Sequence, residues 1–352
     1  MTYDIKRSVS LYSYQDEFYN KQLDLEGCLR ETAKSGATGV ELLAEQMIRK
    51  FPLPIEEESF REKWFGWLKQ YNLQPSCYDA FLEFKLYDNR TLTLKEQVNM
   101  MKRDIRLASM LGFTNLRTLV STPMPVIEGS LEYAEQMGVK IGLEVHAPFS
   151  LNSSWADGYM EMITRTGTRF FGFIPDMGIF CKNIPDVVRE KYLRRGAKPE
   201  CIKIVDDCYA ERVAKGFTKI KYDLNLGKAN MEYRVANGMG EMMEAVKRAG
   251  GGPADLGYAA ESFVFSWSDP QDLIDNIDYI FHTHAKCYNT SEDYVETATA
   301  IPEVVDAFKR AGYKGYLSTE YEGGEHLRAD CDVDSIEQVR RHQEALRRAI
   351  EG

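Results

Sequence analysis

Short apolar runs rich in β-branched and aromatic residues alternate along the chain with longer segments whose apolar positions recur every three or four residues. Such runs indicate buried strands, and the longer spacing indicates amphipathic helices. The predicted strands are 7–11, 39–43, 75–78, 115–120, 140–146, 171–176, 279–284 and 316–320. The predicted helices are 23–35, 57–70, 94–111, 127–137, 156–164, 302–311 and 336–350.

Several predicted helices end in glycine and turn residues directly before a strand, as in "KSGATGVEL", "MLGFTNLR" and "RAGYKGYL". A glycine just past a helix adopts the left-handed conformation that ends it. Repeated β–α units with such short returns predict a parallel sheet, and the count favours a closed (β/α)₈ TIM barrel. We therefore expect one barrel domain over residues 1–352. A doubly wound open sheet is the alternative.

One interval between predicted strands is much longer than the others. Between strands 6 and 7 we expect a long insertion at approximately 187–275, rich in charged and turn residues. Two interpretations stay open: helical decoration of the barrel, or a lid or partner-docking surface.

Composition excludes several classes of protein. The net charge of −10 disfavours a nucleic-acid partner, because such binding draws on neutralised phosphates. The chain has neither an apolar run long enough for a membrane span nor a signal-peptide pattern, so we expect a cytoplasmic protein without membrane contact. Seven cysteines without C-x-x-C argue against a disulfide framework and a thiolate zinc site. The absence of glycine-rich phosphate loops argues against a nucleotide cofactor.

Charged residues interrupt the predicted strands near their carboxyl ends. In "VKIGLEVHAP", residues 139–148, Glu144 and His146 share one face of the strand. Alternation places Glu144, Asp176, His284 and Glu320 on the inward face of four successive strands, where barrel active sites lie. Three carboxylates and an imidazole suit one octahedral divalent ion, with Mn²⁺ favoured and Mg²⁺ or Co²⁺ as alternatives.

Other polar residues lie around these strand ends. His146 is a candidate general base on the substrate, or a partner that orients a metal ligand. Lys286 lies at the rim, where it either stabilises a developing oxyanion or is solvated. For His282, one pleat deeper, we expect a ligand-orienting or core role. Candidates for contact with a substrate, with packing as the alternative, are Tyr12, Tyr14, Gln15, Glu45, Gln46, Asp79, Trp155 and Glu322.

At these residues the chain resembles the xylose-isomerase-like superfamily of sugar phosphate isomerases and epimerases. The landmarks are "EVH", "PD", "HAK" and "STE". The resemblance implies a (β/α)₈ barrel whose metal ligands are Glu144, Asp176, His284 and Glu320. Tagatose-type epimerases carry a histidine three residues after the metal aspartate, where this chain has Ile179.

Within that superfamily, "SVSLYSYQ", "ELLAEQMI", "SCYDAF", "LYDNR" and "LEVHAP" resemble the large (alpha) subunit of bacterial C-glycoside deglycosidases. This resemblance implies metal-dependent cleavage of the sugar–aglycone C–C bond of 3-oxo-C-glycosides, an oxidised sugar conjugate as substrate and a small beta subunit. His146 would remove the proton next to the ketone, and β-elimination would follow.

Three rival functions differ in what they require. A divalent-metal ketose 3-epimerase or aldose–ketose isomerase would use the same metal and proton transfer. An AP-endonuclease-like barrel needs a histidine-rich zinc cluster, whereas this acidic chain has five histidines. The intact ligand set argues against a degenerate, non-catalytic barrel.

Overall fold

The computed structural model describes residues 3–52, 57–83, 86–221, 226–327 and 333–352. Eight parallel strands form one sheet in the order β6-β5-β4-β3-β2-β1-β8-β7. They are β1 (Lys6–Ser10), β2 (Gly39–Leu43), β3 (Gln74–Ala80), β4 (Asn115–Thr118), β5 (Lys140–Val145), β6 (Phe171–Pro175), β7 (Thr283–Cys287) and β8 (Tyr316–Tyr321).

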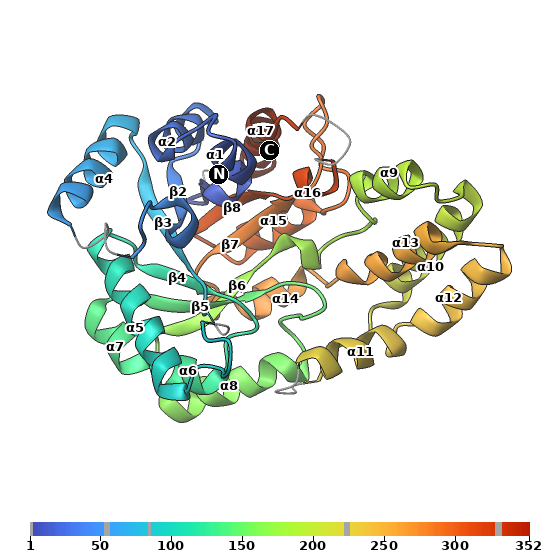
Figure 1. The fold of residues 1–352 in the computed structure, drawn as a ribbon, viewed down its shortest axis with the longest axis horizontal. Coiled ribbons are helices and arrows are strands. Elements are labelled where there is room, and N and C mark those ends of the chain that lie inside the picture. The colour runs from blue at the N-terminus through green and yellow to red at the C-terminus, as the bar shows by residue number, and fades with distance from the viewer. Residues whose placement is uncertain (1–2, 53–56, 84–85, 222–225, 328–332) are drawn as a thin grey trace.

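The sheet curls into a nearly closed barrel (Figure 1). The seam lies between β6 and β7, which are joined by the isolated parallel bridges Phe173–Ile280 and Asp176–His284. At this seam the Phe281 N–H donates to the Phe173 carbonyl at 3.1 Å. The predicted (β/α)₈ barrel is confirmed, and the open doubly wound sheet is wrong.

Helices cover the outside of the barrel. Before β6 these are α1 (Gln15–Tyr19), α2 (Leu25–Lys34), α3 (Ala44–Met47), α4 (Glu58–Tyr71), α5 (Leu94–Met110), α6 (Met124–Glu128), α7 (Leu131–Met137) and α8 (Ser154–Thr166). After β7 they are α15 (Ile301–Arg310), α16 (Gly324–Leu327) and α17 (Ser335–Glu351). Among the described residues, no helix is both long and apolar enough to cross a membrane.

Two predicted elements differ from the structure. The single helix expected over 127–137 is two helices, α6 and α7, separated by Gly129 and Ser130. The strand expected over 279–284 begins four residues later, because Ile277–Tyr279 forms a 3₁₀ turn and Ile280 makes only an isolated bridge. The periodicity showed an apolar segment in both cases but could not show where its backbone changes direction.

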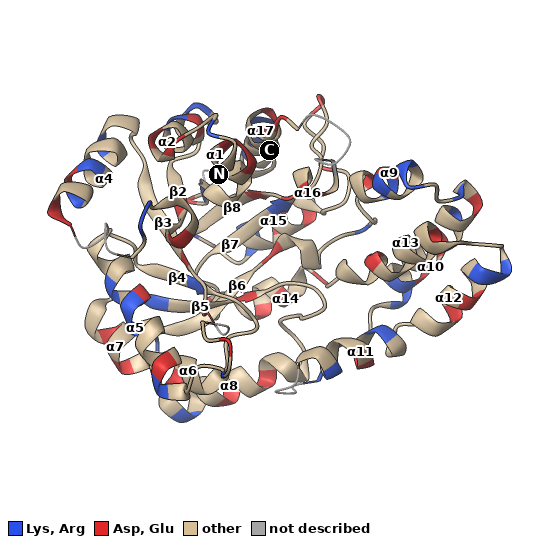
Figure 2. Cartoon of the chain, in the orientation of Figure 1, with Lys and Arg blue, Asp and Glu red and all other residues tan. Residues whose placement is uncertain are grey.

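The chain between β6 and β7 is helical. It contains α9 (Asp186–Arg194), α10 (Pro199–Lys215), α11 (Leu226–Ala236), α12 (Met239–Arg248), α13 (Pro253–Glu261) and α14 (Gln271–Asp275). Helix α13 packs against α9, α10 and α12, and this group lies beside the barrel on the right of Figure 1. Figure 2 shows charges of both signs along α10, α11 and α12. Within the insertion predicted at 187–275, residues 222–225 lie outside the described part of the chain.

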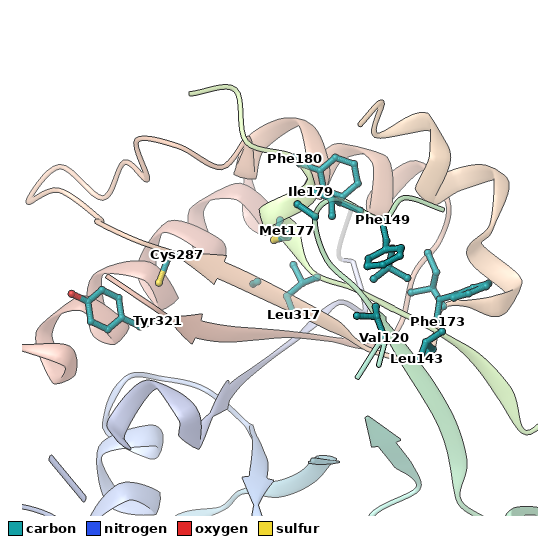
Figure 3. Close-up of a cluster of buried hydrophobic side chains, with 14 of the residues drawn as sticks. Val120, Leu143, Phe149, Phe173, Met177, Ile179, Phe180, Cys287, Leu317 and Tyr321 are labelled. Atoms are coloured by element: carbon teal, nitrogen blue, oxygen red, sulfur yellow. The ribbon is translucent and has the colours of Figure 1, made fainter. Parts of the chain in front are cut away.

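Hydrophobic side chains fill the space behind the β5 and β6 strand ends (Figure 3). Leu143 from β5 and Phe173 from β6 belong to this cluster, as do Phe149 and the 3₁₀ turn Met177–Ile179 that follow these strands. All are buried. Because this layer is tightly packed, it fixes the backbone from which Glu144 and Asp176 point into the barrel.

Candidate active site

Four acidic and histidine side chains from β5, β6, β7 and β8 meet at the carboxyl end of the barrel. One ligand-type atom from each of Glu144, Asp176, His284 and Glu320 lies within 4.8 Å of the other three. All four residues are buried. The structure therefore brings together the four residues that the strand alternation had placed on one inward face.

The four residues do not lie at one level in the strand register. Asp176 is bridged to His284, but Glu144 pairs with Ile174 and Glu320 pairs with Lys286. The offset is two residues from β5 to β6 and from β7 to β8, and there is none from β6 to β7, so every side chain stays on the inward face. Strands in a barrel are tilted against its axis, so this stagger brings the side chains to a common height.

Two buried cations compensate part of this negative charge. Arg117 of β4 places Nη2 at 3.1 Å from Glu144 Oε2. Lys286 places Nζ at 2.9 Å from Asp176 Oδ2, 2.7 Å from Glu320 Oε2 and 2.6 Å from Glu322 Oε1. The solvated alternative for Lys286 is wrong, since its side chain is only 7% exposed. Barrel closure encloses it among carboxylates of two neighbouring strands.

A further carboxylate, Glu41 of β2, lies deeper and contacts both histidines of β7. Its Oε2 lies 2.6 Å from His282 Nε2, and its Oε1 lies 3.0 Å from His284 Nε2. On the other side of its ring, His284 Nδ1 lies 2.9 Å from Glu144 and 3.2 Å from Glu320. A carboxylate that holds the far nitrogen of an imidazole fixes the direction in which the near nitrogen points.

The pKa shifts show opposing effects of burial and charge. Burial by itself raises the pKa of Glu144, but Arg117 and His284 outweigh it and hold that pKa well below its usual value. Burial also acts on Glu320, where His284 and Lys286 lower the pKa to about 2. The pKa of Asp176 is raised by burial and by repulsion from Glu320 and Glu144, against the opposing effect of Lys286. The buried cations therefore compensate only part of the negative charge that these three carboxylates would carry when ionised.

The residues fit a divalent cation. Glu320 Oε2 is buried and makes no hydrogen bond of acceptable geometry within the described structure, although Lys286 Nζ is near. Three carboxylates and one imidazole are ligands of the type that Mn²⁺, Mg²⁺ or Co²⁺ accept. Two deeper groups, Glu41 with Cys77 and His282, and Glu41 with Asp79 and His284, have similar spacing. Glu41, Cys77, Asp79 and His282 do not line the cavity, whereas Glu144, Asp176 and Glu320 do.

His146 follows β5 and lines the cavity above the four acidic and histidine side chains. Its Nδ1 lies 2.8 Å from the carbonyl oxygen of Ala147. A carbonyl oxygen only accepts, so Nδ1 carries the hydrogen, and in the neutral ring Nε2 keeps its lone pair. The ring edge also packs against Phe149, with centroids 6.2 Å apart. These contacts hold the imidazole in one orientation.

The cavity over these residues has a volume of about 360 Å³. Its charged wall contains Arg117, Glu144, His146, Asp176, Lys286, Glu320 and Glu322, and its remaining wall contains Tyr12, Gln46, Phe81, Leu119, Ala147, Gly178, Val264 and Tyr288. Val264 comes from the 3₁₀ turn Ser262–Val264 in the segment between β6 and β7. Of the predicted substrate-contacting residues, Tyr12, Gln46 and Glu322 line this cavity.

Four predicted substrate contacts lie elsewhere. Trp155 is buried in the first turn of α8, 4.6 Å from Phe149 and 5.1 Å from Tyr159 between ring centroids. Gln15 begins α1 and lines a separate small pocket beside Tyr321. Glu45 lies on α3, and the residue that follows it, Gln46, lines the cavity instead. Asp79 lies behind Arg117 at 3.7 Å from its Nε. Being near a strand end was not enough, because the loop direction decides which side chains reach the cavity.

For Tyr14 the sequence left substrate contact and core packing open. Its side chain is completely buried in the core. Sequence reasoning missed Glu41 and Arg117. Both interrupt apolar strands, in "GVELL" and "NLRTLV", as Glu144 does in "GLEV". The cost of burying an unpaired charge would have marked them in the same way.

Comparison with known proteins gives a consistent result. The model of the xylose isomerase-like TIM barrel family matches residues 29–198. The C-glycoside deglycosidase alpha subunit of Arthrobacter globiformis is 27% identical over 351 residues, covering 99% of this chain and 93% of that protein. The resemblance inferred from the sequence is confirmed.

Two further proteins extend the comparison. The 3'-dehydrocarminate deglycosidase alpha subunit of a Microbacterium species is 24% identical over 318 residues, covering 90% of this chain and 87% of that protein. The solved structure of L-ribulose 3-epimerase aligns with a TM-score of 0.52 at 11% identity, covering 98% of this chain and 95% of that one. At this identity the epimerase shows a shared fold alone. The relatives are deglycosidases, which supports an enzymatic role for this chain.

Proposed function

We propose that this chain is the alpha subunit of a C-glycoside deglycosidase and cleaves the sugar–aglycone C–C bond of 3-oxo-C-glycosides. The observation that carries the proposal is the likeness to deglycosidase alpha subunits over nearly the whole of both chains.

The cavity supports a substrate with a polar and an apolar half. The acidic and basic side chains of the lining suit the oxygens of an oxidised sugar. Phe81, Leu119, Val264 and Tyr288 also line the cavity and suit an aromatic aglycone. A ketohexose carries no aromatic group to contact these side chains, so they favour the deglycosidase.

Glu144, Asp176, His284 and Glu320 would hold one divalent cation, for which we propose Mn²⁺, with Mg²⁺ or Co²⁺ as alternatives. When bound, such a cation supplies Lewis-acid polarisation of the 3-oxo group. The side chains around it have separate tasks. Glu41 orients His284, and Lys286 bridges Asp176, Glu320 and Glu322, so that the carboxylates keep their directions.

His146 is our proposed general base. Its Nδ1–H is held by the Ala147 carbonyl, so the lone pair on Nε2 takes the proton from carbon 2 of the sugar, next to the ketone. The electron pair of that C–H bond forms the double bond between carbons 1 and 2. The bond from carbon 1 to the aglycone then breaks, and its electron pair stays on the ring carbon, which accepts a proton. The products are the unsaturated 3-oxo sugar and the free aglycone.

A small beta subunit completes the proposed enzyme. The support is that the relatives from Arthrobacter and Microbacterium are named alpha subunits. Co-expression with any small protein encoded beside this chain, followed by co-purification, tests this part separately from the chemistry.

NMR in D₂O tests the proposed function. The protein is loaded with Mg²⁺ to limit line broadening and given a 3-oxo-C-glucoside or, separately, a ketohexose, with and without the small protein. Release of free aglycone is the expected result. Deuterium entering the ketohexose beside its carbonyl, with the C-glucoside untouched, would refute the deglycosidase and indicate a 3-epimerase or aldose–ketose isomerase.

A further inference from the structure

Arg117 of β4 is a buried cation in the wall of the cavity. Its side chain is only 7% exposed. Three carboxylates surround one edge of the guanidinium: Glu144 at 3.1 Å from Nη2, Asp79 at 3.7 Å from Nε and Glu320 at 3.9 Å from Nη2. Two of these acids belong to the proposed metal site. The guanidinium therefore borders the proposed metal site.

Most of the hydrogen-bonding capacity of this guanidinium is unused. Nε and Nη1 are buried and have no hydrogen-bond partner in the described part of the protein. Leaving a buried charged donor unpaired costs more than a typical hydrogen bond contributes, so a partner is expected when the enzyme is at work. The ammonium of Lys286, by contrast, already meets three carboxylates within 2.9 Å.

The surroundings hold the guanidinium in one plane. Glu144 fixes it through Nη2, and the ring of Phe81 lies 5.2 Å from its central carbon. A planar cation held in this way offers fixed donors without reorganisation when charge develops nearby. In the β-elimination proposed above, negative charge develops on the 3-oxo oxygen as the proton leaves carbon 2.

We propose that Arg117 is a catalytic residue whose guanidinium, in the wall of the cavity, donates to the 3-oxo oxygen and stabilises the enolate. The inference rests on the proposed function, since it takes its substrate from there. It assigns to Arg117 the oxyanion-stabilising task that the sequence suggested for Lys286.

A substrate without an aglycone isolates this step. In 1,5-anhydro-3-oxo-glucitol carbon 1 carries no aglycone, so enolate formation is followed as exchange of the carbon 2 hydrogen in D₂O. With saturating Mg²⁺, Arg117→Met should lower the exchange rate constant by about 100-fold or more, the usual loss on removing one oxyanion donor. Arg117→Lys keeps the charge without the planar fork and should recover part of the rate.

A control and a metal titration separate catalysis from structure. Arg103→Met removes an arginine that pairs with buried Asp104 away from the cavity, and it should leave the exchange rate unchanged. The Mn²⁺ dissociation constant of Arg117→Met is measured beside that of the wild type. If Arg117 were only the counter-ion of Glu144, the Mn²⁺ affinity would change and exchange at saturating metal would not.

The outcomes are distinguishable. Slow exchange in Arg117→Met at saturating metal, with partial recovery in Arg117→Lys, supports the inference. Wild-type exchange in Arg117→Met overturns it and leaves the proposed function intact. If the wild-type protein neither exchanges this compound nor cleaves the C-glucoside, the proposed function and the inference are both overturned.

Discussion

Replacing Glu41 with glutamine tests how the protein orients its proposed metal ligand. Glu41 is completely buried, and its two oxygens lie 2.6 Å from His282 Nε2 and 3.0 Å from His284 Nε2. As a carboxylate it accepts a hydrogen bond from His282 and presents its second oxygen to His284 as a charge contact. In Glu41→Gln one oxygen becomes an NH₂ group, so one imidazole N–H faces another donor. His284 then loses either its orientation or its tautomer.

The size of the effect follows from these contacts. Loss of a partner that orients a metal-binding histidine weakens metal affinity by about 10–100-fold, which corresponds to about 1.4–2.8 kcal/mol. The donor left without an acceptor costs about 1–3 kcal/mol of folding stability in addition. We therefore expect a weaker Mn²⁺ dissociation constant in a protein that still folds.

Calorimetric titration of metal-free protein with Mn²⁺ measures this directly. Glu45→Gln is the matched control, because Glu45 lies on the adjacent α3 and does not line the cavity. His282→Gln is a second variant, since its amide NH₂ still donates to Glu41 and leaves the contact to His284 in place. A folded Glu41→Gln protein that binds Mn²⁺ as tightly as the wild type would refute the reasoning.

Three further variants test separate parts of the structure. His146→Gln should lower the carbon 2 exchange rate by about 10²–10⁴-fold with unchanged Mn²⁺ affinity, and a large loss of Mn²⁺ binding would instead indicate a ligand-orienting role. Burial lowers the pKa of His342 to about 3, whereas its pKa in the unfolded chain is about 6.5. As the pH falls below about 6.5 the unfolded chain therefore takes up the proton first, and the folded protein loses stability that it has at higher pH. Between pH 7 and pH 5 the free energy of unfolding, measured in urea, should therefore fall by about 2 kcal/mol less in His342→Gln than in the wild type. An equal fall in both proteins would contradict this. Trp155→Phe should cost about 1–3 kcal/mol of stability while the cleavage rate per folded molecule stays the same, and a rise in KM would show that Trp155 reaches the substrate after all.

The barrel could be predicted because its signal is local. Each strand is a short apolar run, and each return is closed by turn residues such as those of "KSGATGVEL". The period of two along a strand then placed Glu144 and Glu320 on the inward side without any knowledge of their neighbours. The strand that was misplaced, β7, begins after a 3₁₀ turn whose apolar residues resemble a strand in sequence.

The contacts of individual side chains were less predictable. The cost of burying a charge, which identified Glu144, applies equally to Glu41 and Arg117, so the sequence contained the signal needed to find both. Trp155 and Gln15 were a different case. Both were expected near strand ends, but the chain turns there into α8 and α1, where Trp155 packs against Tyr159 and Gln15 lies beside Tyr321.

The sequence by itself determined the strands, the inward face of each and the chemical type of the proposed metal ligands, because these depend on the spacing of neighbouring residues. Only the tertiary structure decided that Asp176 and His284 meet across the seam, and that Lys286 is enclosed by carboxylates from β6 and β8. It also decided that Arg117 keeps unpaired donors beside Glu144. These contacts join residues far apart in the chain, and their distances follow from barrel closure and strand stagger, which no local pattern records.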